Sequence, residues 1–177
     1  MRGSGREGEK IMKLKPGPAV LAATAMCLGI PGAAQTVKVD QLTQAQLARK
    51  AQSLAAKAEA GDGSASIKLA DYPNHFTMIA YREKSGGAEV HENFADFFLV
   101  VNGSATLITG GKVQNPRTTG LGEIRGTAVQ GGTRQALKKG DVVHIPAGVS
   151  HQLLLPKGKT FSYFVIKVKE QELAPAR

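Results

Sequence analysis

From residue 67 onward, apolar and polar positions alternate with a period of two, in short runs separated by Gly, Pro, Asn or Asp. Alternation of this kind, broken by turn residues, is typical of β-strands. No stretch between the runs has the length and pattern of a crossover helix, so the strands should pair antiparallel in a sandwich or barrel. The strands are expected over residues 67–70, 76–82, 97–101, 105–109, 142–145, 152–155 and 161–168.

Two local features refine this all-β prediction. Asn102-Gly103 stands between two apolar runs and predicts a two-residue hairpin turn. Residues 110–135 contain seven glycines in 26 positions. Such a segment is either a long loop that acts as a lid or binds something, or a hairpin excursion in which 112–114 pairs with 127–130.

The pattern before residue 66 is helical instead. Asp40 is a candidate N-cap, Gly61 a candidate stop, and apolar residues between them recur at helical spacing. We therefore expect a helix over 41–60 within a helix-and-linker segment, 35–65, ahead of a barrel that occupies 66–177. Because its apolar stripe is rich in alanine, the helix should pack on the outside of the sheet or on a partner subunit.

The first 34 residues resemble a signal peptide. Lys13 and Lys15 precede an apolar run, 19–30, which ends in Pro31 and small residues suited to cleavage before Gln35. The run is shorter than the ~20 residues that span a bilayer, so no stable membrane anchor should remain after cleavage. We expect an N-terminal extension and signal peptide over 1–34 and a periplasmic or secreted protein.

Composition narrows the chemistry. The single cysteine, Cys27, lies in the apolar run and would leave with it, which excludes thiol catalysis and thiolate metal ligands in the mature chain. The net charge is +9, but the basic residues are scattered and not interleaved with aromatic ones, so a nucleic-acid partner is not expected. A solvated basic surface, or weak steering of an anionic substrate, accounts for the charge.

Two segments, 86–103 and 140–151, carry the candidate chemistry. The first contains His91, Asn93 and Asp96, and the second ends in His151 after a Pro-x-Gly turn. This pair of motifs, within residues 75–169, resembles those of the cupin superfamily of small jelly-roll barrels. The resemblance implies a cupin-type jelly-roll β-barrel with an N-terminal helix, a bound divalent metal ion (Fe, Mn, Ni or Zn) and a homodimer.

The first motif departs from the family pattern at two positions. Asn93 stands where a second histidine is usual, and Asp96 replaces the glutamate. The resemblance implies His91, Asn93, Asp96 and His151 as metal ligands, with Asn93 either ligating or hydrogen-bonding a bound water. The alternative is a polar pocket without metal, in which the two histidines are hydrogen-bonded.

Strand geometry supports a site independently of the family. Residues two apart on a strand share a face, so Glu89, His91 and Asn93 can all point into a barrel. Two imidazoles and a carboxylate that converge there suit a divalent cation with open coordination positions. Asp96 is the first choice for the carboxylate and Glu89 the second.

Two function classes remain open. One is a metal-dependent enzyme acting on a small organic substrate, of dioxygenase, isomerase or lyase type, in which Tyr81, Glu89 or His144 transfers protons. The other is an exported, non-catalytic cupin that binds a small ligand or a metal. For His144, a structural role on its strand is the alternative to a place in the pocket.

Overall fold

The alternating pattern after residue 67 folds as β-strands, and they form one extended antiparallel sheet and a small two-stranded one. The computed structural model describes residues 39–170, so the expected leader and Cys27 lie outside the described residues. The helices are α1 (Gln44–Gln52) and α2 (Ala55–Glu59). The strands are β1 (Ser64–Asp71), β2 (His75–Arg82), β3 (Ala88–His91), β4 (Phe94–Thr109), β5 (Lys112–Gln114), β6 (Arg117–Gly120), β7 (Glu123–Gly126), β8 (Ala128–Gln130), β9 (Thr133–Lys138), β10 (Val142–Ile145), β11 (His151–Leu154) and β12 (Phe161–Lys169).

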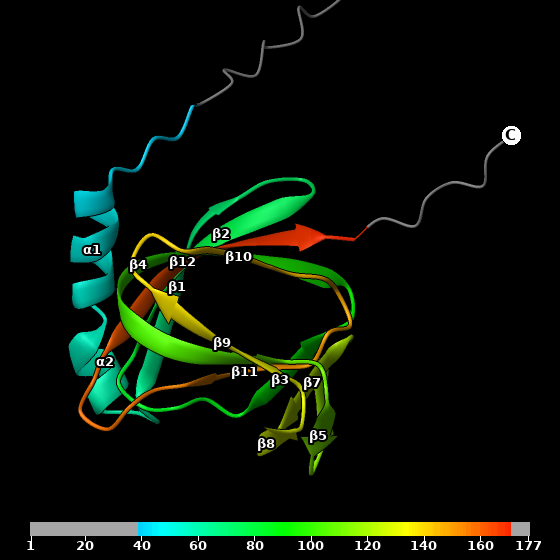
Figure 1. Ribbon diagram of the computed structural model, residues 1–177. Coiled ribbons are helices and arrows are strands. Elements are labelled where there is room, and N and C mark those ends of the chain that lie inside the picture. Colours follow the sequence, from blue (N-terminus) through cyan, green and yellow to red (C-terminus); the bar gives the residue numbers. More distant parts are fainter. Residues whose placement is uncertain (1–38, 171–177) are drawn as a thin grey trace, which may run out of the picture. The chain divides into compact units, whose positions relative to one another are not determined.

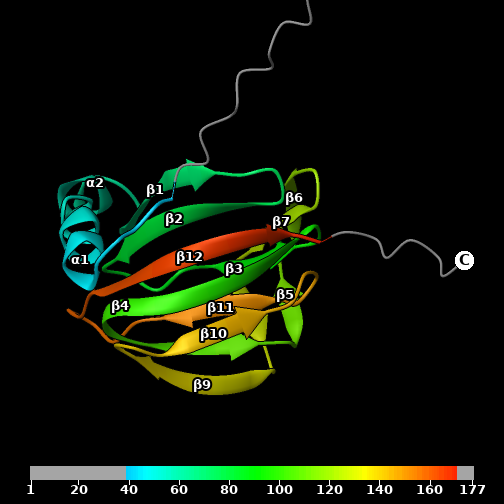
Figure 2. The same cartoon turned by 90° about the horizontal axis from the view of Figure 1, so that it is seen from above.

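The long strand β4 determines the topology. Its first half pairs with β10 and β12, and its second half pairs with β9 and β11. The main sheet runs in the order β1-β2-β12-β4-β11-β3-β7-β6, and β4 bends round as it passes from one half to the other (Figures 1 and 2). The result is a curled antiparallel half-barrel with a helical segment at its N-terminal end, which confirms the mostly-β fold class expected from the sequence.

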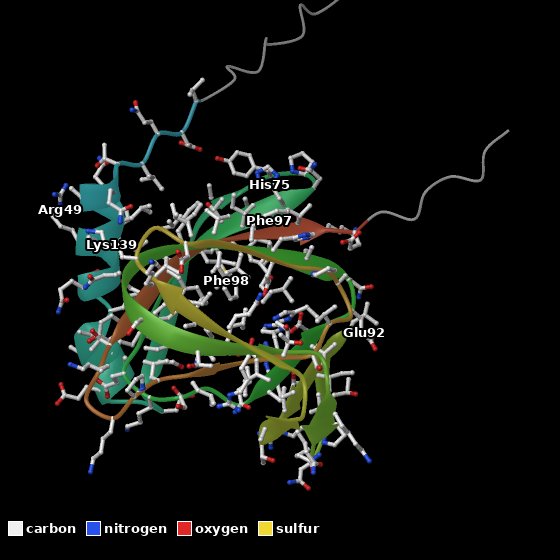
Figure 3. All side chains as sticks on the ribbon, in the orientation of Figure 1. Arg49, His75, Glu92, Phe97, Phe98 and Lys139 are labelled. Carbon is white, nitrogen blue, oxygen red and sulfur yellow. The ribbon has the colours of Figure 1, made fainter. Side chains whose placement is uncertain are left out.

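Alternation along the strands divides the apolar residues between the two faces of the sheet. Phe98, Val100 and Tyr163 belong to the core inside the curl, and Figure 3 shows Phe98 there. The neighbouring positions Ile79 and Val101 face outward against the helices. Burial of both faces explains why these strands contain so few polar residues.

The helical segment packs on the outside of the sheet, as expected, but its N-cap and its continuity differ from the prediction. Its N-cap is Thr43, whose hydroxyl accepts from the Gln46 backbone in a capping box, and not Asp40. The helix is also interrupted between Gln52 and Ala55. At the interruption the Ser53 hydroxyl donates to the Lys50 carbonyl at 2.8 Å, a side-chain bond that competes with the helical backbone ladder.

The expected hairpin at Asn102-Gly103 is wrong. β4 continues through both residues, and the pairing with β12 shifts register just before them, with a bulge at Val101. Gly103 has φ +80°, and its backbone passes so close to Thr160 that a Cβ would lie 2.0 Å from the Thr160 carbonyl oxygen. The glycine thus marks a close approach of two chain segments and not a turn.

The glycine-rich segment is built of short strands. Within it β5 pairs with β8, and β6 pairs with β7, which in turn joins the main sheet through β3. β7 and β6 therefore extend the main sheet along β3. Among the described residues, no helix is long and apolar enough to cross a membrane.

Gly103→Ala should lower the free energy of unfolding by more than about 2 kcal/mol, because the new Cβ adds a backbone clash to an unfavourable φ. Gly158→Ala is the matched control, since Gly158 has φ +73° and nothing within 4 Å of a built Cβ. It should cost about 1–2 kcal/mol. Urea denaturation measures both, and equal losses would contradict the close-approach role of Gly103.

Candidate metal centre

Three side chains meet inside the half-barrel. Glu89, His91 and His151 each offer one ligand atom, and these atoms lie within 4.8 Å of one another. The ring centroids of the two histidines are 5.3 Å apart. The expected convergence of the two imidazoles beside a carboxylate is therefore found.

Strand pairing explains the convergence. Glu89 and His91 are two residues apart on β3 and so share its inward face. On the neighbouring strand β11, His151 lies directly opposite Glu89 in the antiparallel register. Side chains of directly paired residues are the closest neighbours across two strands.

Each imidazole is held through Nδ1. His91 Nδ1 donates to Glu123 Oε2 at 2.7 Å, and His151 Nδ1 donates to the Val149 carbonyl oxygen at 3.1 Å. An ionised carboxylate and a carbonyl only accept hydrogen bonds, so the proton of a neutral ring stays on Nδ1. In the neutral rings, both Nε2 atoms therefore present lone pairs to the centre of the cluster.

Carboxylate oxygens face these Nε2 atoms. His91 Nε2 is 3.4 Å from Glu89 Oε2 and 3.6 Å from Asp96 Oδ2, and His151 Nε2 is 3.7 Å from the same Asp96 oxygen. Asp96 is almost completely buried, and its other oxygen pairs with Lys167 Nζ at 2.6 Å. Asp96 and Lys167 are cross-strand partners on β4 and β12. Asp96, the carboxylate that the sequence favoured as a ligand, therefore lies beside the cluster. The carboxylate within the cluster is that of Glu89, the second choice from the sequence.

Charge keeps Glu89 ionised. Burial acts to raise the pKa of Glu89, but nearby basic groups, the guanidinium of Arg125 among them, oppose burial, and the pKa lies well below its usual range. Arg82 Nη2 also pairs with Glu89 Oε1 at 3.2 Å. Burial lowers the pKa of His151, which keeps that ring neutral at neutral pH. An anionic carboxylate beside a neutral imidazole is the protonation state that binds metal.

The cluster borders a cavity of about 410 Å³. Tyr163 lies in its wall, and the Tyr163 hydroxyl accepts a hydrogen bond from Arg82 Nε at 3.2 Å. Burial raises the pKa of Tyr163, so the phenol keeps its proton. It can therefore donate a hydrogen bond to a ligand in the cavity.

Three residues singled out from the sequence are not brought to the cluster. Asn93 is exposed after the end of β3, and its amide lies against Gly122. Tyr81 packs in the outer core against the helices, although it borders the cavity at one edge. His144 is exposed on β10 and stacks on Phe97, with ring centroids 4.3 Å apart.

Sequence reasoning missed several charged neighbours of the cluster. Arg82 and Lys167 stand at inward positions of their strands, each after alternating apolar residues, so strand parity could have identified both. Glu123 and Arg125 lie in the glycine-rich segment, where no periodicity indicates a strand. Their proximity to His91 and Glu89 follows from the pairing of β7 with β3.

The donor set fits a divalent cation. His91 Nε2 is buried and has no hydrogen-bond partner among residues 39–170. A buried polar atom without a partner is costly, and lone pairs that face carboxylates repel them unless a positive charge lies between. Two imidazole nitrogens and a carboxylate oxygen are ligands for Zn²⁺ and for Fe²⁺, Mn²⁺ or Ni²⁺.

Comparison with known proteins gives likenesses of fold. No family model matches the chain, and no curated protein matches it. A cupin domain from Schizosaccharomyces pombe aligns with 9% identity over 60% of this chain and 61% of that chain, with a TM-score of 0.46. A DMSP lyase from Ruegeria pomeroyi aligns with 16% identity over 64% of this chain and 50% of that chain, also with a TM-score of 0.46.

A third likeness is to a salicylate 1,2-dioxygenase mutant from Pseudoaminobacter salicylatoxidans in complex with gentisate. It has 14% identity, covers 70% of this chain and 32% of that chain, and has a TM-score of 0.49. The alignments thus span less than two thirds of each of these three solved chains.

Glu123→Ala should weaken binding of Zn²⁺ about 10- to 100-fold, because the residue holds the His91 ring in orientation and tautomer. Glu123→Gln keeps an acceptor for Nδ1 and should lose less. Glu92→Ala, an exposed acid on the adjoining turn, is the control. Competition with a chromogenic chelator measures the affinities, and an equal loss in the Glu92 and Glu123 variants would contradict the orienting role.

Proposed function

We propose that this chain is an exported, metal-binding protein of cupin fold that acts on a small organic substrate within its half-barrel. The observation that supports it is the convergence of Glu89, His91 and His151 beside a cavity. The site combines convergent polar groups with a strongly shifted pKa at Glu89, as functional sites commonly do.

A divalent cation bound there would polarise a carbonyl or hydroxyl oxygen of the substrate. The chain's own residues bind and orient. His91 and His151 are fixed through Nδ1, and Asp96 is held by Lys167, so the ligand atoms are positioned before the cation arrives. Tyr163 keeps its proton beside the cavity and can donate a hydrogen bond to a substrate oxygen.

The second candidate is a protein that binds a small ligand or metal without catalysis. It is favoured by the positions of Tyr81 and His144, two of the residues expected to transfer protons, because neither side chain joins the cluster. Turnover, measured after metal loading, separates the two candidates. The charges that line the cavity indicate the substrate class for that assay.

Tag-free full-length chain, purified after growth with added divalent metals, should contain about one equivalent of metal. His151→Ala should remove it, since it deletes one of two imidazole ligands. Elemental analysis gives the stoichiometry, and thermal denaturation checks that the variant folds. His75→Ala is the matched control, because His75 stacks on Tyr72 outside the cluster. Metal-free parent protein, or equal loss in both variants, would reject the proposal.

Export and dimerisation also remain proposals. If residues 1–34 form a signal peptide, the chain recovered from the periplasm or medium should begin at Gln35. N-terminal sequencing tests this, and an unprocessed chain confined to the cytosol would contradict it. A homodimer, the state implied by the family resemblance, is tested by light scattering.

A further inference from the structure

The cavity beside the cluster carries an excess of positive charge. Its lining includes four basic side chains, Lys57, Arg82, Arg125 and Lys167, against three acidic ones, Asp62, Glu89 and Asp96. A divalent cation at the proposed centre would add two further positive charges. Low-dielectric walls strengthen such a field, so the space favours an anionic ligand.

The two least exposed of these cations enter from opposite ends. Arg82 pairs with Phe161 in the β2–β12 ladder, whereas Lys167 pairs with Phe76. Phe76 and Arg82 are six residues apart on β2, so the backbones at the two levels are about 20 Å apart along the strands, and the side chains of Arg82 and Lys167 both reach inward from there toward the candidate metal centre. Arg82 reaches Glu89 and Lys167 reaches Asp96, which places a cation on each side of the candidate metal centre.

The cavity also offers more hydrogen-bond donors than free acceptors. The guanidinium of Arg82, the ammonium of Lys167 and the hydroxyl of Tyr163 all donate. The carboxylates of Glu89 and Asp96 already face basic groups at 3.2 Å and 2.6 Å. A ligand that supplies acceptors at both ends would match this arrangement.

We propose that the cavity binds a small organic acid with two carboxylates, one directed to the Arg82–Tyr163 end and the other to the Lys167 end. This inference rests on the proposed function for its role as substrate, but the anion contacts come from the chain's own residues. The planar guanidinium suits a carboxylate, and the tyrosine hydroxyl adds a neutral donor beside it. At about 410 Å³ the cavity has room for a chain of a few carbons between the two groups.

The test is isothermal titration calorimetry of the full chain with succinate, butyrate and succinamide, in metal-loaded and chelator-treated samples of measured metal content. Succinate should bind most tightly, butyrate more weakly, and the uncharged succinamide weakest. The preference should hold without metal and strengthen with it. Inorganic phosphate, a compact anion that cannot reach both ends, should bind more weakly than succinate.

Two variants probe the two sides of the centre. Lys167→Met removes the cation of one end, and Arg125→Gln removes the second arginine that faces Glu89, beside the Arg82–Tyr163 end. Each should weaken succinate binding about 10-fold or more, the scale of a lost charge-assisted hydrogen bond. Arg125 is more exposed than Lys167, so its variant keeps the test informative if loss of Lys167 impairs folding. Lys169→Met is the matched control on the same strand, outside the cavity lining, and should change the affinity less than about twofold.

The outcomes are distinguishable. Metal binding without a preference for succinate over succinamide would overturn this inference and leave the metal centre intact. Succinate binding to a chain that retains no metal would support the anion site and reject the metal-dependent function. Butyrate or phosphate binding as tightly as succinate, or equal losses in the Lys169 and Lys167 variants, would overturn the dicarboxylate assignment.

Discussion

Two neutral imidazoles direct their Nε2 lone pairs at carboxylate oxygens, and this arrangement is repulsive unless a positive charge lies between them. At His91 and His151 the tautomers follow from acceptors at Nδ1, so neither ring can donate from Nε2 while it is neutral. A proton or a metal cation has to supply this positive charge. Burial opposes a proton on His151, and the nitrogen and oxygen donor set suits a divalent ion.

The pairing register of the strands brings these side chains together. β3 presents Glu89 and His91 on one face, β11 sets His151 opposite Glu89, and β4 delivers Asp96 against Lys167 on β12. Because a shift of one residue would turn each side chain to the other face, the register that buries the apolar core also assembles the site. The glycine-rich segment contributes the outer acceptor on Glu123 by adding β7 beside β3.

The sequence was sufficient for the parts that depend on periodicity. The alternation of apolar and polar residues predicted most of the strands. The two-residue spacing predicted that Glu89 and His91 lie on the same face of one strand. The sequence was insufficient where contacts between distant parts of the chain determine the local structure. Asn102-Gly103 has the composition of a hairpin turn, yet β4 continues through it and the Thr160 backbone lies close to Gly103. Asn93 shares the parity of His91, but β3 ends at His91 and leaves the amide outside.

The central claim is that His91 and His151 bind one cation together, with charged neighbours arranged around them. X-ray absorption spectroscopy of the Zn²⁺-loaded chain tests it most directly. The account predicts a shell of nitrogen and oxygen ligands at about 2.0–2.2 Å with outer-shell scattering from two imidazoles per ion. A zinc shell without imidazole scattering, or with that of a single ring, would contradict it.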